Sequence, residues 1–393
     1  MISSLTRARR SLALALAVGL ALAACGSDDS SSPSPSTASP ASTPAGESSA
    51  PATEAATGGS IPKLDGTQLA ILAPGSSGVY LAQLQESVVD RFDEATGAQT
   101  QFEQSQCGLT KLSTAVETGN VPWALVTMCN RSEFDKAVEA GVLQPIDTTA
   151  VPLDLLSDGT YSEYGFEKSK YAGAIAWNTD AFPLDGPHPT SIVDIFDLEK
   201  FPGKRCLVNY PEFYGILEAA ALHAGSSRDN LYPIDVDAAL KELDTIRSSI
   251  TFVTSSAQGL QSLMTGECVM GTFGNGQVFA ATLENEGAPL AMSFGDAITG
   301  SGFIGIPKGA HDKDASEALL SWLIQDREGL AKFAAETAYT FGELKDPVPF
   351  TDAAAPFALT PQNQALTIAE DADWYSTNLD SILEKFNAWL VAG

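Results

Sequence analysis

The stretch Gly266-Glu267-Cys268-Val269-Met270-Gly271-Thr272-Phe273-Gly274-Asn275-Gly276-Gln277 joins a short apolar run to a glycine-flanked polar turn. The run from Cys268 to Phe273 contains β-branched residues and is bounded by glycines, a pattern typical of a buried strand. Glycine tolerates unusual dihedrals and close approach, so Gly274-Asn275-Gly276 is predicted to be a turn that presents an amide to a ligand. The alternative is an ordinary turn without a ligand.

Strands and helices alternate on both sides of this stretch. Apolar runs predict strands at residues 68–73, 100–103, 124–128, 171–177, 206–208, 251–253 and 303–308. Helices are predicted at residues 81–92, 109–117, 132–140, 192–198, 214–223, 236–246, 257–264 and 379–390, with a further helix after Asp314. Ser132-x-x-Asp135 and Asp314-x-x-Glu317 are predicted capping boxes. The alternation predicts an α/β fold with parallel sheets and ligands at the carboxyl ends of the strands, and because it runs twice it suggests two lobes.

The N-terminal segment predicts export. Three arginines precede an apolar run, residues 12–24, that is too short to cross a bilayer, as in a signal peptide. Leu22-Ala23-Ala24-Cys25 resembles a bacterial lipobox, in which Cys25 becomes the acylated N-terminus. An ordinary signal peptide is the alternative. We therefore expect a signal peptide at 1–24, a disordered Ser/Pro/Ala-rich tether at 25–62 and a lipid anchor on the outer face of the bacterial cell membrane.

The chain is strongly acidic, with a formal net charge of −27. Loss of the three arginines in the signal segment makes the mature chain more negative still. Such a chain is not expected to bind nucleic acid, and membrane contact is expected through the lipid anchor only. The acidity is explained either by solubility outside the cell or by attraction of cationic ligands.

The cysteines agree with export to an oxidising compartment. Apart from Cys25, four remain, an even number that permits three disulfide pairings. The strand positions favour Cys107–Cys129 and Cys206–Cys268, each within one lobe. A zinc site is the rival interpretation, but no pair is spaced Cys-x-x-Cys and the three histidines lie far apart in sequence, so no metal site is expected.

Several segments together resemble the extracellular solute-binding proteins of ABC importers, in particular the spermidine/putrescine-binding branch. They occur in the family's order: 141–147, 176–180, 201–205, 230–237, 255–258, 266–276 and 306–310. The resemblance implies a two-lobed periplasmic-binding-protein-like fold of type II, with parallel-rich sheets flanked by helices and a ligand cleft between the lobes. Lobe 1 is expected at 63–170 plus 303–340 and lobe 2 at 171–302 plus 341–393, with hinge strands near 171–177 and 302–306.

The resemblance carries over less well to the ligand. Polyamine binders similar to this chain have a tryptophan and an aspartate at the positions of Gly274 and Gly302. Phe273 or Phe303 is then a candidate for the ring, and Glu212 or Asp296 for the charge. A small organic cation, shorter or bulkier than spermidine, is the predicted ligand, and a non-cationic solute is the alternative. The expected binding residues are Ser76, Ser77, Thr127, Met128, Tyr210, Glu212, Tyr214, Gln258, Phe273, Asn275, Gln277, Asp296 and Ser301.

Two other classes of function compete with solute binding. For a lipid-anchored exported hydrolase, the sequence shows no Gly-x-Ser-x-Gly, Walker loop or His-Glu-x-x-His, so no catalytic residue or cofactor is predicted. A structural or adhesive lipoprotein is the third class. The ordered family segments favour a monomeric binding protein that delivers a small molecule to the transmembrane subunits of an ABC permease.

Overall fold

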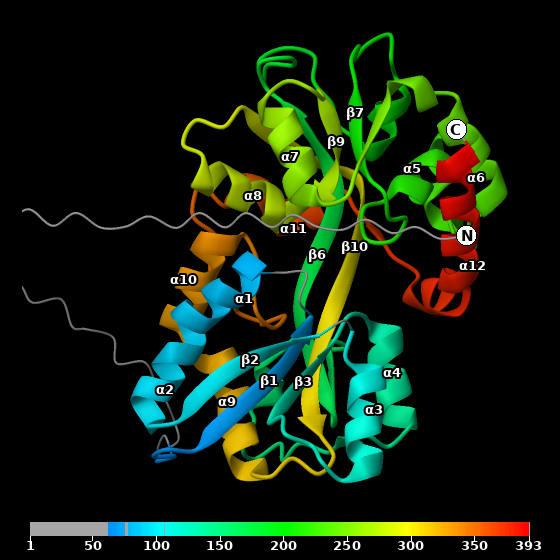
Figure 1. Ribbon diagram of the computed structural model, residues 1–393. Helices are drawn as coiled ribbons and strands as arrows, with labels where there is room; N and C mark the ends of the chain where they lie inside the picture. The colour runs from blue at the N-terminus through cyan, green and yellow to red at the C-terminus, as the bar shows by residue number, and fades with distance from the viewer. Residues whose placement is uncertain (1–61, 75–77, 106, 393) are drawn as a thin grey trace, which may run out of the picture. The chain divides into compact units, whose positions relative to one another are not determined.

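The computed structural model describes residues 62–74, 78–105 and 107–392, and its central feature is a pair of long antiparallel strands (Figure 1). These are β6 (Gly165–Asn178) and β10 (Leu290–Pro307), which pair along most of their length. The strand order of the sheet is β2-β1-β3-β10-β6-β9-β7-β8. The predicted signal peptide, Cys25 and nearly all of the predicted tether lie outside the described residues.

Lobe 1 is built on the β1, β2 and β3 end of the sheet. β1 is parallel to β2 and β3, and β10 then joins β3 in the antiparallel sense. One apolar core lies under α1, α2, α9 and α10, and a second lies under α3 and α4. The elements are β1 (Gln68–Pro74), α1 (Gly78–Leu84), α2 (Asp90–Thr96), β2 (Gln99–Ser105), α3 (Leu109–Thr118), β3 (Leu125–Met128), α4 (Arg131–Glu139), β4 (Leu143–Gln144), β5 (Tyr161–Ser162), α9 (Lys313–Gln325) and α10 (Arg327–Thr337).

Lobe 2 is built on the β9, β7 and β8 end. β7 is parallel to β8 and β9, and β9 joins β6 in the antiparallel sense. One core lies under α5, α6 and α12, and the other lies under α7 and α8. The elements are β7 (Arg205–Val208), α5 (Ile216–His223), α6 (Val236–Asp244), β8 (Ile250–Val253), α7 (Ser256–Met264), β9 (Met270–Gly274), α8 (Asn275–Glu284), α11 (Pro361–Gln364), β11 (Ile368–Ala369) and α12 (Ala372–Ala392).

The predicted α/β alternation is thus present at both ends of the sheet, and the two ends share β6 and β10. The sequence predicts only 303–308 as a strand, whereas β10 has 18 residues. Its first part contains Gly295, Gly300 and Gly302, which weaken a strand pattern, and pairing with β6 overrides that weakness. The exact lobe boundaries remain a prediction.

The helix starts correct both predicted capping boxes. Asn130, not Ser132, caps α4, because its side chain accepts a hydrogen bond from the Glu133 N–H. Asp312, not Asp314, caps α9 through the Ala315 N–H. In each case the true cap lies two residues earlier, so the predicted cap is already inside the first turn.

Both disulfides in the structure have the pairing that the strand positions favour. Cys107 is joined to Cys129 and Cys206 to Cys268, each with an S–S distance of 2.03 Å. Cys107 and Cys129 lie beside Glu133, the one grouping of possible metal-binding residues found in the described part of the chain. Because both sulfurs are in the disulfide and Glu133 accepts the N–H groups of Leu109 and Cys129, these groups already have partners.

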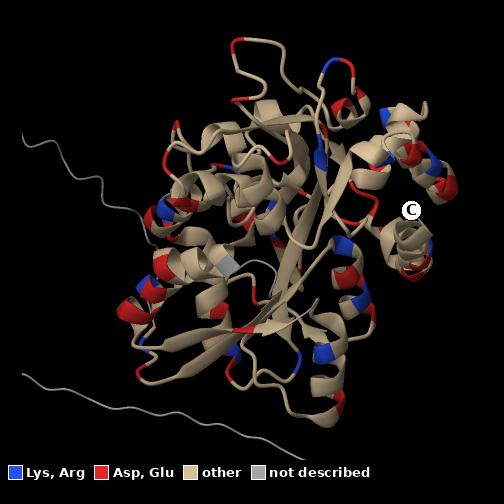
Figure 2. Ribbon diagram, turned by 45° about the horizontal axis from the view of Figure 1, so that its top comes forward, with Lys and Arg blue, Asp and Glu red and all other residues tan. Residues whose placement is uncertain are grey.

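Acidic residues are spread over helices and loops of both lobes (Figure 2). This distribution fits the interpretation of the acidity as a solubility feature. Among residues 62–392, no helix in the described part has both the length and the apolar character needed to span a bilayer.

Candidate ligand-binding site

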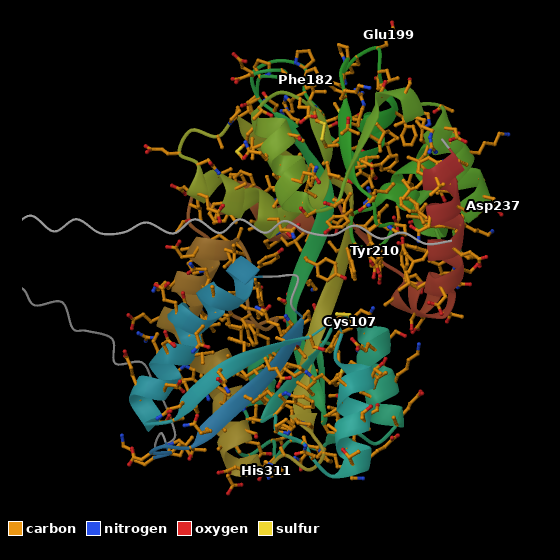
Figure 3. The ribbon with its side chains drawn as sticks, in the orientation of Figure 1. Cys107, Phe182, Glu199, Tyr210, Asp237 and His311 are labelled. Carbon is orange, nitrogen blue, oxygen red and sulfur yellow. A yellow bond between two sulfur atoms is a disulfide. The ribbon has the colours of Figure 1, made fainter. Side chains whose placement is uncertain are left out.

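The loop that follows β7 carries an unusual group of aromatic residues. Tyr210, Phe213 and Tyr214 lie within five positions, and Phe213 has a φ of +73°. A bulky residue rarely adopts this left-handed conformation, and such strain is concentrated at functional sites. A Cβ atom on Gly173 would lie 2.3 Å from the Phe213 carbonyl oxygen, so the loop lies directly against β6. Figure 3 shows Tyr210 near the boundary between the two lobes, with Cys107 on the other side of it.

Two buried carboxyl groups lie beside this loop. Glu212 is 5% exposed, and burial raises its pKa to about 7, although a hydrogen bond from the Tyr210 hydroxyl (3.0 Å) opposes the shift. Burial also raises the pKa of Glu370 well above its usual range, and the charge of Glu212 raises it further. Both Glu370 carboxylate oxygens are buried without a hydrogen-bond partner among the described residues. Buried carboxyl groups without partners are costly, and they are candidates for contact with a ligand.

Tyr171 lies on the shared strand β6, close enough to both carboxyl groups for their charges to raise its pKa. It pairs with Gly300 across β6 and β10, and a Cβ atom on Gly300 would lie only 2.3 Å from the Tyr171 hydroxyl oxygen. That hydroxyl is buried with no partner in the described structure, and burial, followed by the charges of Glu370 and Glu212, raises its pKa. The Tyr171 ring packs edge-on against Phe213, with the ring centroids 5.8 Å apart.

Glu370 reaches this position through the C-terminal segment. β11 pairs in parallel with Ile298 and Thr299 of β10, and the Glu370 N–H then donates to the Thr299 carbonyl (2.8 Å). The Glu370 backbone therefore lies next to Gly300, along the edge of β10 that faces away from β6. The site thus draws on the loop after β7, on β6 and β10, and on residue 370.

Several predicted binding residues are part of the framework. Asn275 is fully buried in the first turn of α8; its side chain accepts from the Ala172 N–H (3.0 Å) and donates to the Phe357 carbonyl (2.9 Å). The predicted Gly-Asn-Gly turn is therefore wrong, because Gly274 is the N-cap of α8 and Asn275 is helical. Phe273 and Phe303, the two candidates for the ring, are 0% and 3% exposed within apolar cores.

Of the remaining candidates on lobe 1 and on the shared strand β10, two are buried, one is half-buried and two lie outside the described residues. Thr127 donates its hydroxyl to the Leu72 carbonyl (3.0 Å), and Met128 packs in the core under α3 and α4. Ser76 and Ser77 lie outside the described residues, so their contacts remain a prediction. Ser301 is half-buried on β10, opposite Lys170.

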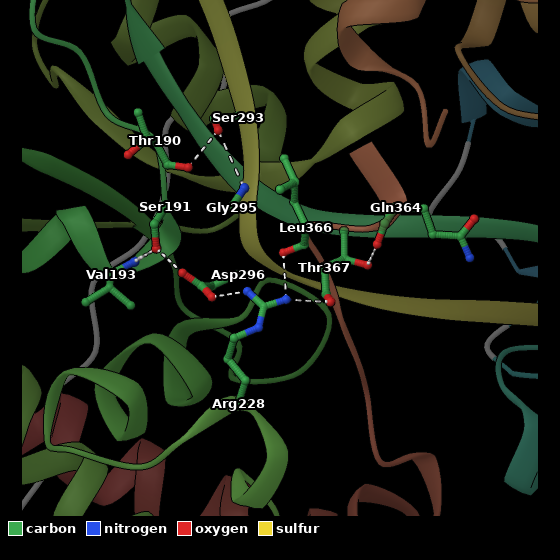
Figure 4. A network of polar contacts seen from close by, with 10 residues as sticks. All are labelled: Thr190, Ser191, Val193, Arg228, Ser293, Gly295, Asp296, Gln364, Leu366 and Thr367. Atoms are coloured by element: carbon green, nitrogen blue, oxygen red, sulfur yellow. Dashed lines mark hydrogen bonds and ion pairs between the residues drawn. The ribbon is translucent and has the colours of Figure 1, made fainter. Parts of the chain in front are cut away.

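In lobe 2, Asp296 is held in a network of its own (Figure 4). One carboxylate oxygen pairs with Arg228, and the other accepts from the Ser191 hydroxyl (2.6 Å). Arg228 also donates to the carbonyls of Leu366 (3.0 Å) and Thr367 (2.9 Å). Both oxygens of Asp296 have partners, so its charge is used to hold the segment that leads to Glu370.

The remaining candidates differ in their burial and in whether their polar atoms have hydrogen-bond partners. The Gln258 side-chain oxygen accepts from the N–H and hydroxyl of Thr254 and is occupied locally. Tyr214 is half-buried against both lobe-2 cores. Gln277, in the first turn of α8, has a buried side-chain oxygen without a partner in the described structure. A Cβ atom on Gly274 would lie 2.8 Å from that oxygen, so the Gln277 amide lies beside the position that the resemblance assigns to a tryptophan.

Comparison with known proteins agrees with this architecture. The family model for the bacterial extracellular solute-binding proteins matches residues 87–363. The γ-aminobutyric acid-binding protein of Pseudomonas aeruginosa is 25% identical over 325 residues, which cover 79% of this chain and 88% of that protein. A solved GABA receptor is 27% identical, with a TM-score of 0.68 over 82% of this chain and 97% of that one.

Two further crystal structures support the same assignment. An ABC transporter from Rhodopseudomonas palustris CGA009 is 26% identical with a TM-score of 0.67, and an ABC transporter substrate-binding protein from Bradyrhizobium japonicum USDA 110 is 26% identical with a TM-score of 0.69. Each alignment covers 82% of this chain and 99% of the other. The chain belongs to the bacterial extracellular solute-binding protein family, the non-enzymatic, two-lobed proteins that bind small solutes for ABC importers.

Proposed function

We propose that the solute carries an ammonium group and that Glu212 and Glu370 bind it. The observation that carries this proposal is the pair of Glu370 oxygens, buried without a partner in the described structure and close enough to Glu212 for its charge to raise the Glu370 pKa. Two carboxyl groups in one buried place repel each other when ionised, and a cation between them removes that repulsion.

The aromatic rings around the carboxyl groups support the same ligand chemistry. Tyr210 and Phe213 stack with centroids 6.1 Å apart, and Tyr171 packs edge-on against Phe213. Ring faces attract ammonium groups and also cover the methylenes attached to them. The names of two relatives favour such a ligand as well, because γ-aminobutyric acid has an ammonium group on a short chain.

Titration calorimetry with γ-aminobutyrate and butylamine tests the proposal. Glu212→Gln should weaken binding of both compounds by roughly one or two powers of ten, because a charge-assisted hydrogen bond contributes about 1.5–3 kcal/mol. Glu328→Gln is the matched control, since it removes one negative charge at an exposed position beside Arg91. Equal loss of affinity in the two variants, or no binding of either ammonium compound, would contradict the proposal.

The anchoring and assembly predicted from the sequence belong to the same proposal. We propose that Cys25 is acylated, that the protein is a monomer held at the outer face of the cell membrane, and that two lobes with the boundaries given above close on the solute. The motivation for the anchor is the lipobox-like Leu22-Ala23-Ala24-Cys25. Mass spectrometry of the N-terminal peptide from membranes tests it, and an unmodified Cys25 thiol would exclude the anchor.

A further inference from the structure

Lys168 occupies an irregular position in β6. In the pairing of β6 with β10, Ser169 lies opposite Gly302 and Glu167 lies opposite Phe303, so the pairing passes over Lys168. Such an extra residue is a β-bulge, a feature that redirects side chains and is common beside functional sites. The Lys168 carbonyl accepts a hydrogen bond from the Gly342 N–H (2.6 Å), which holds the bulge in place.

At the bulge, the Lys168 side chain packs against Gly302. A Cβ atom on Gly302 would lie 2.9 Å from Lys168 Cε, so a larger residue there would displace the lysine. The Lys168 ammonium ends over the ring of Tyr80, 4.6 Å from its centroid. Gly302 is the position that the resemblance assigns to an acidic residue in polyamine binders. This chain therefore has a positive charge close to where that carboxylate would lie.

Within the part of the chain that the structure describes, no carboxylate compensates the charge of Lys168. The residue is 9% exposed, and it forms no ion pair with any residue that the structure describes. Burial alone lowers its pKa to about 8, and no acidic group opposes that shift. With that pKa the amine is still mostly protonated at pH 7. Buried lysines are ordinarily paired, so this one resembles the unpaired carboxyl groups of the site, with the opposite charge.

The two kinds of unpaired charge lie a short distance apart along one strand. Gly300 and Gly302 are two residues apart on β10 and face the same side, which corresponds to about 7 Å. The Tyr171 hydroxyl lies over Gly300 with Glu370 beside it, and Lys168 Cε lies over Gly302. Side chains that lie over these two glycines can therefore contact the two ends of an amino acid whose charged groups are separated by a few methylenes.

We propose that Lys168 binds a carboxylate on the same solute whose ammonium group is bound by Glu212 and Glu370, so that the ligand class is the short ω-amino acids. This inference rests on the proposed function and adds the second charge of the ligand. A simple amine would leave Lys168 buried and unpaired. A diamine or polyamine would bring a positive group against it, which is unfavourable at such short range.

The test uses the chain from Gly26 onward, which omits the proposed lipid-attachment residue Cys25, and it compares ligands that differ by one charge. γ-Aminobutyrate carries both charges, butylamine only the ammonium group, and butyrate only the carboxylate. Wild-type protein should bind γ-aminobutyrate at least tenfold more tightly than butylamine, as measured by titration calorimetry. Lys168→Met keeps the aliphatic part of the side chain, and it should remove this preference while leaving the affinity for butylamine within about twofold. Lys170→Met is the matched control, because Lys170 already pairs with Glu343 (3.0 Å).

The outcomes separate the two proposals. If butylamine binds as tightly as γ-aminobutyrate, or if Lys168→Met keeps the preference, the inference about Lys168 is wrong and the ammonium site stands. If Glu212→Gln changes no affinity while Lys168→Met weakens both γ-aminobutyrate and butyrate, the ammonium site is wrong and Lys168 is an anion site. If butyrate alone binds and Lys168→Met does not affect it, both are wrong.

Discussion

Two groups of polar residues surround neighbouring positions of β10, Asp296 and Gly300. The groups differ in whether their polar atoms have hydrogen-bond partners. Around Asp296, both carboxylate oxygens and the Arg228 guanidinium are occupied by one another, by Ser191 and by two backbone carbonyls. Around Gly300, the Glu370 oxygens and the Tyr171 hydroxyl have no partner among the described residues. A hydrogen-bond network in which every group has a partner stabilises the fold. Buried polar groups without partners lower the stability of the protein until a ligand supplies the missing contacts.

The two groups are also mechanically linked. Arg228 holds the carbonyls of Leu366 and Thr367, and β11 follows directly and brings Glu370 to the site. The network around Asp296 thus positions Glu370, a residue of the group without partners. This arrangement is consistent with the general finding that binding residues are placed by a rigid framework whose own contacts are complete.

The largest effect is expected from the two disulfides, whose sulfur atoms belong neither to the group around Asp296 nor to the group around Gly300. Replacing Cys206 and Cys268 by serine should lower the free energy of unfolding by roughly 4 kcal/mol, because the bond closes a long loop, with a sequence separation of 62. Replacing Cys107 and Cys129, with a separation of 22, should cost about 1 kcal/mol less.

Denaturant unfolding of both variants measures the difference, and non-reducing peptide mapping of the wild type verifies the pairs. Ligand affinity should change little in the Cys206 variant, since that bond lies in the core under α7 and α8. Free thiols at all four positions would contradict the pairing, and a larger loss in the Cys107 variant would contradict the loop-length argument.

The second largest effect on stability is expected in the network around Asp296. Arg228→Met should lower the free energy of unfolding by about 2 kcal/mol, because Asp296 and two carbonyls lose a donor in a partly exposed setting. Arg327→Met is the matched control, since Arg327 pairs with an Asp346 side chain that is 98% exposed. Thermal unfolding of the two variants decides the point. A loss of stability no greater than in the control would show that this network does not hold the segment before Glu370.

Part of this comparison was predictable from sequence. The position after strand β7 singled out Tyr210, Glu212 and Tyr214, because residues at strand ends in α/β proteins face ligands. Whether they contact one remains a prediction. The two glycines at 274 and 302 also marked places where the polyamine-type side chains are missing, and the structure shows Gln277 and Lys168 beside them.

The rest depends on pairing that local sequence does not encode. Lys168 is redirected by a bulge that exists only because β6 pairs with β10. Glu370 is positioned by a strand of two residues, which is too short to show a periodic pattern. Asn275 and Asp296 have the residue types of a binding site, but tertiary contacts already occupy their polar atoms. A residue's type indicates what it could bind, whereas its availability is decided by the neighbours that the fold supplies.

The smallest effect has the opposite sign and gives the sharpest test of the comparison. The folded-state pKa of Glu212 is about 7, above the value near 4.3 expected in the unfolded chain. The folded protein therefore binds this proton more tightly, so the contribution of Glu212 to stability is most favourable below pH 4.3 and is lost as pH rises through 7. Glu212→Gln removes the ionisation, so the ligand-free variant should be more stable than the wild type at pH 8 by about 1–2 kcal/mol, with little difference near pH 4.5. Thermal unfolding at both pH values, with Glu328→Gln as the control, measures this difference in stability.

Since the ligand ammonium requires the ionised carboxylate, wild-type affinity should also fall as pH drops below 7, by at most about tenfold per pH unit for one proton. A Glu212→Gln variant that is destabilised at pH 8 would show that the Glu212 charge is already compensated in the free protein, which would contradict its role as an uncompensated charge near Glu370.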